Sequence, residues 1–255
     1  MELLILALVG LGASFVKSAF GLGAGVLFGP VLALFLEPRL AMGMTAPIMF
    51  LSSVAALGAH WRRWDWPLLR RLLPTALFGL ALGSYFLAWT PATSVRRAIG
   101  LAALAFAAAQ TVRLQRQDGE APDPPDGPVR AARERPALQQ AAVAALLGFG
   151  GGIVSGIAHS GGLFFSMYLL PRLGKAAFVA SLTLTLFVVD TFRLVSYWYL
   201  DVLESRHLAL SLPCLPLMLL GGRLGKALGG RLSDRGFARA LILMIAGTGV
   251  ALLVR

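Results

Sequence analysis

The chain has 255 residues, of which 57% are hydrophobic and only 14% are charged. Soluble domains carry about a quarter charged residues, so this composition excludes a water-exposed surface over most of the chain and indicates lipid as the main solvent. The formal net charge is +11, but the Lys and Arg residues lie between apolar runs and form no basic stripe interleaved with aromatic residues. They are therefore interpreted as signals of membrane topology, and no nucleic-acid partner is expected.

The chain offers little for cofactor chemistry. Three His and a single cysteine, Cys214, cannot make a Cys/His metal cluster or an intrachain disulfide. The Gly-x-x-x-x-Gly-Lys-Ser/Thr motif of nucleotide-binding proteins is absent from the sequence. We therefore expect no metal, no cofactor and an energy source other than ATP. The first residues include Glu2 but no early Lys or Arg, which predicts a first membrane helix instead of a signal peptide.

Eight apolar runs follow one another, and most have the ~20 residues that a spanning helix needs. Two runs have 34 residues each, and a single helix of that length would reach about 51 Å. A glycine-rich break interrupts each of them near its middle, which predicts a pair of short helices folded back as a hairpin that does not fully cross. The eight runs cover residues 3–36, 41–60, 67–88, 95–112, 137–170, 177–200, 207–229 and 237–254.

The runs fall into two similar halves. Residues 113–136 are rich in Pro and in charges of both signs, so they are predicted to form a disordered linker. Residues 1–112 and 137–255 each contain one broken long run and then three spans, with Ala41–Thr45 aligned to Ala177–Ser181. The predicted fold class is an all-α polytopic membrane protein with two transmembrane repeats, each a broken helical hairpin plus three transmembrane helices.

Charge counting chooses the topology. If each broken run returns to the side from which it started, sixteen of the 23 Lys and Arg residues lie on one side and five on the other. If each broken run crossed once, the two sides would carry almost equal numbers and the positive-inside bias would vanish. The first arrangement predicts periplasmic termini, a cytoplasmic linker and a second repeat that is inverted relative to the first, as in many secondary transporters.

Ionisable groups inside the apolar runs are the first candidates for function. Lys17 lies four residues before the first break, and Asp190 and Arg193 lie at i,i+3 spacing in run 177–200, so they can pair. Thr183 and Tyr197 extend the pair to one polar stripe. The charges of Lys17, Asp190 and Arg193 sum to +1, which favours an anion. Snorkelling of Arg193 toward the interface, with Asp190 only neutralising it, is the structural alternative.

The glycine breaks are the second candidate. A helix that restarts after Gly21, Gly23 and Gly25, or after Ser160, Gly161 and Gly162, presents free N–H groups and the positive end of its dipole. Close helix packing is the alternative explanation for these glycines. His159 adjoins the second break and is a candidate for a proton relay, although a lone His is more often structural.

An intramembrane serine hydrolase is a third interpretation. Ser155 and His159 lie at i,i+4 spacing in a Gly-rich setting. The segment Gly152–Gly156 does not match the Gly-x-Ser-x-Gly nucleophile elbow, because its first glycine lies one position too early. This interpretation is therefore weaker than transport.

With these segments in view, the sequence resembles the sulfite exporter TauE/SafE family over nearly all of the chain outside the linker. The resemblance rests on the order of several motifs: Gly21–Gly25 and Pro30, Ala41–Thr45, Ser155-Gly156 through Gly162, Tyr168-Leu169-Leu170, and the polar helix with Arg193. It implies movement of sulfite, sulfonates or related organosulfur anions across the cytoplasmic membrane by two related halves. The candidate substrate-binding residues are Lys17, Gly21, Gly23, Gly25, Thr45, His159, Ser160, Gly161, Gly162, Ser181, Asp190 and Arg193.

The sequence thus predicts a secondary transporter for a small sulfur-containing anion, working by alternating access in the bacterial cytoplasmic (inner) membrane. A carrier for another small organic anion and, less favoured, an intramembrane enzyme are the alternatives. The expected partners are the anionic substrate and the lipid bilayer. A coupling proton or sodium ion and a homodimeric assembly stay open at this point.

Overall fold

The computed structural model describes residues 8, 11–12, 14–15, 25–59, 63–117, 137–214, 216–217, 219–221, 223–224 and 234–254, and every regular element within these ranges is a helix. The longer helices are α2 (Gly25–Phe35), α3 (Pro38–Ala59), α4 (Trp66–Trp89), α5 (Ala92–Gln117), α7 (Ala137–Ala158), α9 (Lys175–Tyr199) and α12 (Asp234–Val254). The shorter elements are α8 (Gly162–Leu169), η1 (Leu170–Arg172), α10 (Ser205–Ser211) and η2 (Leu212–Cys214).

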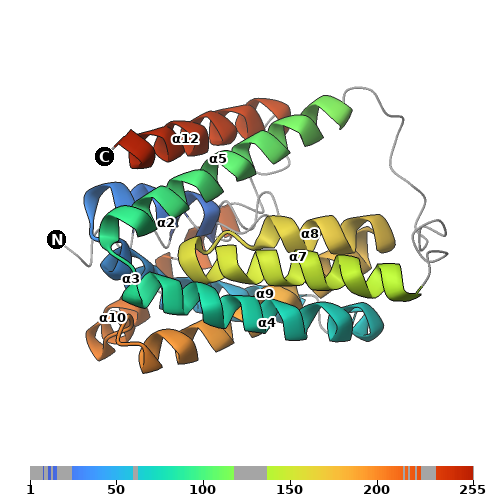
Figure 1. Cartoon of the computed structure of the whole chain (residues 1–255), viewed down its shortest axis with the longest axis horizontal. Coiled ribbons are helices and arrows are strands. Elements are labelled where there is room, and N and C mark those ends of the chain that lie inside the picture. Colours follow the sequence, from blue (N-terminus) through green and yellow to red (C-terminus); the bar gives the residue numbers. More distant parts are fainter. Residues whose placement is uncertain are drawn as a thin grey trace.

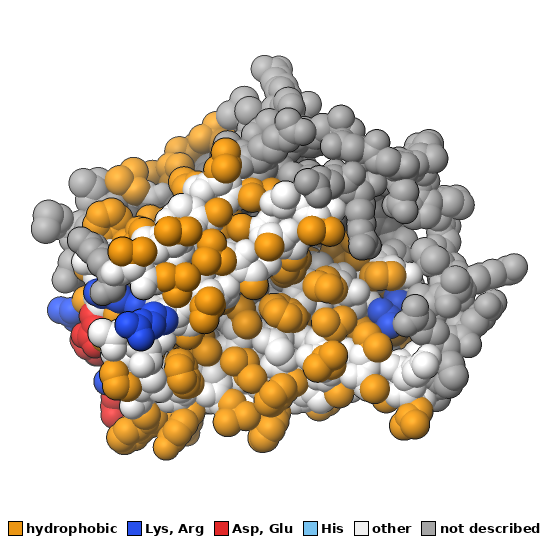
Figure 2. All heavy atoms as spheres, turned by 45° about the horizontal axis from the view of Figure 1, so that its top comes forward, with side chains coloured by type: hydrophobic (Ala, Val, Ile, Leu, Met, Phe, Trp, Pro, Cys, Tyr) orange, Lys and Arg blue, Asp and Glu red, His pale blue; other side chains and the backbone are white. Residues whose placement is uncertain are grey.

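Four helices in the described part of the chain are long and apolar enough to cross a membrane: Trp66–Trp89, Ala92–Val112, Leu138–Ala158 and Ala176–Tyr199. Their outward faces carry large apolar side chains that would be unfavourable in water, such as Phe78, Leu146 and Val195. Hydrophobic side chains cover the middle of the face shown in Figure 2, and charged side chains gather toward its two ends. This pattern is the one expected of a helical bundle surrounded by lipid.

The bundle is built from three helix pairs that join the two halves of the chain (Figure 1). Helix α3 packs against α9, α5 against α12, and α4 against α7. The α5–α12 pair is antiparallel, since Gly100 lies against Leu252 near the end of α12 while Leu104, further along α5, reaches back to Gly249 (Figure 1). The α3–α9 pair is antiparallel as well: Gly43, near the start of α3, adjoins Val202, just after the end of α9.

The α4–α7 pair runs parallel and is the closest of the three. A Cβ added at Gly148, Gly152 or Gly156 of α7 would collide with atoms of α4, and one added at Gly79 or Gly83 of α4 would collide with the backbone of α7. In lipid, where burial of apolar surface does not drive helix association, such small residues let backbones approach and gain dispersion contacts. The three α7 glycines recur every four residues, so they form one continuous stripe along the contact.

The long run 137–170 breaks where the sequence predicts. Helix α7 ends at Ala158, His159 adopts a left-handed φ of 56°, and α8 begins at Gly162. Helix α8 returns beside α7, because Gly151 of α7 contacts Phe164 and Phe165 of α8. The prediction of two short arms was wrong, however. Helix α7 has 22 residues and is long enough to span, and only α8, with eight, is short.

The other predicted break, with Gly21 and Gly23, lies outside the described residues, and Gly25 is the first residue of α2. Helix α5 continues to Gln117, five residues into the segment predicted as a linker. The rest of that segment, 118–136, also lies outside the described residues.

The α4–α7 contact gives a test of the fold. Gly152→Ala adds a methyl group where it would overlap the Ala76 carbonyl oxygen, so α4 and α7 must separate. We expect a loss of about 1–3 kcal/mol, the range for overpacked interiors, measured as a lower melting temperature of the detergent-solubilised protein. The matched control is Gly150→Ala in the same helix, whose new methyl group meets only Phe164 ring carbons at 3.6 and 3.7 Å. Equal stability of the two variants would contradict the close packing.

Candidate functional site

The break after α7 places polar groups inside the bundle. The His159 backbone N–H still donates to Ser155 O at 3.1 Å, and the Ser160 hydroxyl donates to Ala158 O at 2.8 Å. Gly161 packs so closely against Gly151 and Ser155 that a Cβ would overlap them. The start of α8 is therefore held beside the last third of α7, and His159, Ser160, Gly161 and Gly162 are all buried.

Arg193 of α9 is the central charged group near this break. Its Nη1 donates to Asp190 Oδ1 one turn earlier in α9, and its Nη2 donates to the Ser155 hydroxyl of α7. The residue is only 2% exposed, so it does not snorkel to the interface. A charge at this depth is tolerated because a carboxylate and a hydroxyl face it directly.

Asp190 is held from the other half of the chain. The Ser53 hydroxyl of α3 donates to Asp190 Oδ2 at 2.5 Å, and Ser53 is fully buried. The carboxylate thus accepts from the guanidinium through one oxygen and from a hydroxyl through the other. Four side chains, Ser53, Ser155, Asp190 and Arg193, form one network that connects α3, α7 and α9.

Tyr197 and His159 close the network on the side of the break. Tyr197, one turn after Arg193, donates its hydroxyl to Gly156 O at 2.6 Å. Its ring meets the His159 imidazole edge to face, with centroids 6.0 Å apart. The imidazole lies near the Met42 backbone and near Arg193, and neither ring nitrogen reaches hydrogen-bonding geometry with a described group.

The network can bind an anion at Arg193. Of the guanidinium nitrogens, Nη1 and Nη2 have partners, while the buried Nε has none within the described part of the chain. Nε and Nη2 share one edge of the planar group, the edge that binds an oxyanion bidentately. Within the described part of the chain, the hydrogen-bond partner of that edge is the neutral Ser155 hydroxyl, which an oxyanion can displace.

The structure brings some of the predicted site residues together and separates others. Asp190 and Arg193 belong to the network, His159 lies beside it, and Gly161 packs against Ser155 of the network. Ser160 and Gly162 flank Gly161 at the break. Thr45 is buried in α3, where its hydroxyl bonds to Ala41 O at 2.8 Å, and Ser181 accepts from the Asp65 backbone N–H at 3.0 Å, nine residues before Asp190. Lys17 lies outside the described residues.

Ser53 is the site residue that sequence reasoning missed. It follows Ser52 in an apolar run of the half that lacks the polar stripe, and two adjacent serines there give no helical periodicity that would single out Ser53. The sequence presents Ser155 as a candidate nucleophile for His159 and as part of a motif of the family resemblance, not as a partner of Arg193. The Ser155 hydroxyl instead accepts from Arg193, and neither ring nitrogen of His159 pairs with it.

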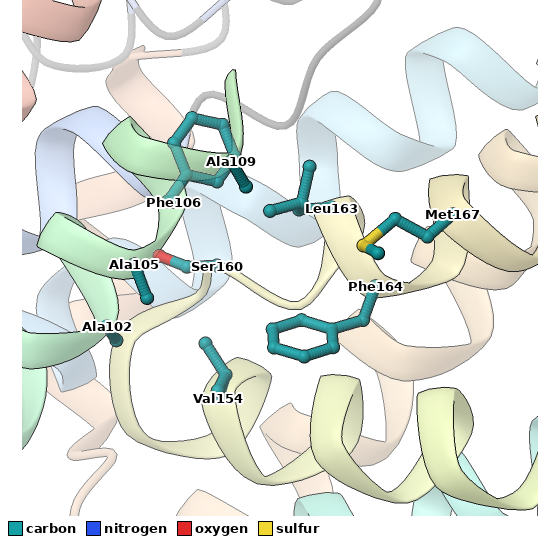
Figure 3. Close-up of a pocket in the computed structure, with 9 residues that line it drawn as sticks. All are labelled: Ala102, Ala105, Phe106, Ala109, Val154, Ser160, Leu163, Phe164 and Met167. Atoms are coloured by element: carbon teal, nitrogen blue, oxygen red, sulfur yellow. The ribbon is translucent and has the colours of Figure 1, made fainter. Parts of the chain in front are cut away.

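A pocket of about 170 Å³ lies between α5 and the α7–α8 hairpin (Figure 3). It is lined by Ala102, Ala105, Phe106, Ala109, Val154, Ser160, Leu163, Phe164 and Met167. Ser160 is its one polar lining residue, and that hydroxyl already bonds to Ala158 O. The pocket is therefore an apolar gap between helices, separate from the Arg193 network in its chemistry.

The comparison with protein families decides the identification. The family model described as "Sulfite exporter TauE/SafE" matches residues 6–252, nearly the whole chain. The chain belongs to the sulfite exporter TauE/SafE family. Membership and the four apolar helices make it a multi-pass membrane protein and point to a sulfite or related sulfur-anion exporter. The family consists of transporters, which is compatible with the expectation that the protein is not an enzyme.

No curated protein and no solved structure matches this chain.

The buried ion pair predicts an unusual stability pattern. Arg193→Gln leaves the Asp190 carboxylate buried without its cation, so the free energy of unfolding should fall by about 3–5 kcal/mol. Asp190→Asn combined with Arg193→Gln removes both charges and should recover most of that loss. Arg206, which pairs with Glu204 at 3.0 Å and is 53% exposed, is the matched control, and Arg206→Gln should cost less than about 1 kcal/mol. Thermal unfolding in detergent measures all three, and a double variant no more stable than Arg193→Gln would contradict the pairing.

Proposed function

We propose that this TauE/SafE-family protein is a secondary transporter that moves a small sulfur-containing oxyanion, such as sulfite or a sulfonate, across the membrane by alternating access. The observation that carries the proposal is the buried Arg193 guanidinium beside a broken helix, one edge of which bonds to a single neutral hydroxyl among the described residues. A buried cation near the interior of an apolar bundle is costly, and such groups usually lie on a substrate pathway.

The chemistry of the substrate class fits this site. Sulfite and sulfonates present several oxygens on one sulfur, so two of them can accept from the Nε and Nη2 of Arg193 together. The start of α8, with Gly161 and Gly162, offers further N–H groups and the positive end of a short helix dipole.

Alternating access is supported by a difference between two helix contacts that would be equivalent in a fold with inverted repeats. The antiparallel α3–α9 and α5–α12 pairs are those expected if α3 and α9, and α5 and α12, are equivalent helices of two inverted repeats. In such a fold, α2 and α8 would be equivalent too. The contact of α12 with α2 would then be equivalent to the contact of α5 with α8. Helix α12 packs against α2, whereas an apolar pocket separates α5 from α8. Closing that pocket and opening the α2 side would give the complementary conformation.

Access to Arg193 also requires movement. The guanidinium is 2% exposed and its Nε is buried, so an anion reaches it only when neighbouring helices shift.

The charge split predicts that the Trp66, Gln117 and Ala137 helix ends face the cytoplasm, while the Trp89 and Val254 ends face the periplasm of the bacterial inner membrane. Figure 1 has these two sets of helix ends at opposite ends of the bundle.

Flux measurements test the proposal. Purified protein in proteoliposomes should transport sulfite or methanesulfonate, and Arg193→Lys should weaken the apparent affinity by about tenfold or more, because a lysine cannot donate along a planar edge. Arg206→Lys is the control, since Arg206 is exposed. A carrier for another organic anion would transport a carboxylate such as acetate but neither sulfur anion. An intramembrane enzyme would transport none of them and would label at Ser155 with a serine-reactive probe.

The proposed movement of α5 has its own test. In a Cys214→Ser background, cysteines at Ala105 of α5 and Met167 of α8 line opposite walls of the pocket. A short bifunctional maleimide should link them at a rate that changes when sulfite is added, and the linked protein should lose flux. Cysteines that replace Leu104 and Leu252, two side chains within the α5–α12 contact, form the control pair whose linking rate should not respond to sulfite. A substrate-independent rate at 105 and 167, with full flux after linking, would show that α5 does not move.

A further inference from the structure

We propose that Asp190 binds a proton when the anion binds to Arg193, so that each anion is carried together with one proton. The inference rests on the proposed function, because it takes Arg193 as the substrate contact. It concerns a different ligand, the proton, and a different residue, Asp190.

The first step is the arrangement around the guanidinium. Asp190 occupies Nη1, and Ser155 is the described residue that bonds to the edge formed by Nε and Nη2. An oxyanion that takes this edge displaces the Ser155 hydroxyl and leaves Asp190 in place on Nη1. One guanidinium then contacts two anions, the substrate and the Asp190 carboxylate.

The second step is the charge balance. Asp190 and Arg193 are 6% and 2% exposed, so they interact in surroundings far less polar than water. Before binding, the pair is neutral. After binding, the three groups would carry a net charge of −1, and a buried net charge is strongly unfavourable. A proton on Asp190 restores neutrality, which makes anion binding and proton binding mutually favourable.

The third step is the surroundings of Asp190. Its neighbours in the network are Ser53 from α3, Ser155 from α7 and Arg193 from α9; Tyr197 and His159 are the next titratable groups. Arg193 is the one described cation in contact with the carboxylate. No second positive charge among the described residues touches Asp190 and could balance a second anion there.

The fourth step is the role of Ser53, which suits both protonation states. Its hydroxyl donates to Asp190 Oδ2 at 2.5 Å when the carboxylate is ionised. A hydroxyl can also accept a hydrogen bond, so it can turn and accept from a proton on Oδ2. Ser53 is thus a positioning residue that keeps Asp190 satisfied before and after protonation.

Binding of methanesulfonate to the full-length protein in nanodiscs tests the inference by calorimetry. This probe is chosen because its own charge does not change between about pH 5 and pH 8, where sulfite and histidine titrate. In the wild-type protein, a linked proton should weaken the affinity by up to roughly tenfold for each unit of rising pH. In weakly buffered solution with a pH indicator, binding should take up about one proton per anion.

Three variants assign the proton. Asp190→Asn imitates the protonated carboxyl, so it should bind the probe at least as tightly as the wild type at high pH, with no pH dependence and no proton uptake. Asp201→Asn is the matched control, at an exposed loop position whose left-handed φ of 54° Asn accepts, and it should keep the wild-type dependence. His159→Asn, also at a left-handed φ, should keep the pH slope whatever its affinity.

The outcomes separate the two proposals. If the wild-type protein binds neither methanesulfonate nor sulfite at any pH, the proposed function fails and this inference fails with it. If the wild-type protein binds with a constant affinity and takes up no proton, the inference alone is overturned. It is also overturned if Asp190→Asn keeps the pH slope, or if His159→Asn loses it, because the proton would then reside elsewhere.

Discussion

The arrangement of this protein depends on one requirement, that a guanidinium be buried within an apolar helical bundle. An isolated charge in such surroundings would cost several kcal/mol after relaxation. Arg193 is tolerated because Asp190 neutralises it and Ser155 accepts from its Nη2, while Ser53 donates to the second oxygen of Asp190. Those four residues come from three helices, so α3, α7 and α9 must be held in register for the charge to be stable. The packing of small residues between α4 and α7 is what fixes α7 in that register.

The network also joins the two halves of the chain through the hydrogen bond between Ser53 and Asp190. Ser53 belongs to residues 1–112, and its partner Asp190 belongs to residues 137–255. A movement of one half relative to the other therefore cannot leave the charge pair unaffected. In the proposed alternating-access cycle, this contact would transmit the charge state of the site to the relative position of α3 and α9. A contact of two apolar side chains at the same place would not distinguish a neutral site from a charged one.

Much of the fold could be predicted from the sequence because lipid imposes a simple length rule on apolar segments. The break near Ser160–Gly162 and the pairing of Asp190 with Arg193 follow from glycine content and i,i+3 spacing, and both are present. The asymmetry of the hairpin could not be predicted, because a run of 34 residues does not reveal where a helix ends. Helix α7 extends to Ala158 because its glycine stripe packs along α4, a contact between distant segments. Ser53 was missed for the same reason: only the tertiary structure brings it to Asp190.

Charge neutrality offers a physical reason for the pair to be a carboxylate and a guanidinium, and not a lone cation. A lone Arg193 would bind an anion more tightly, but the empty carrier would then have to change conformation with an uncompensated buried charge. With Asp190 present, the empty site is neutral. If Asp190 takes up a proton when the anion binds, the loaded site is neutral as well, and only the half-loaded site, with an anion and no proton, carries net charge. The conformational change is then least favourable for that half-loaded state, so the two ligands would cross together.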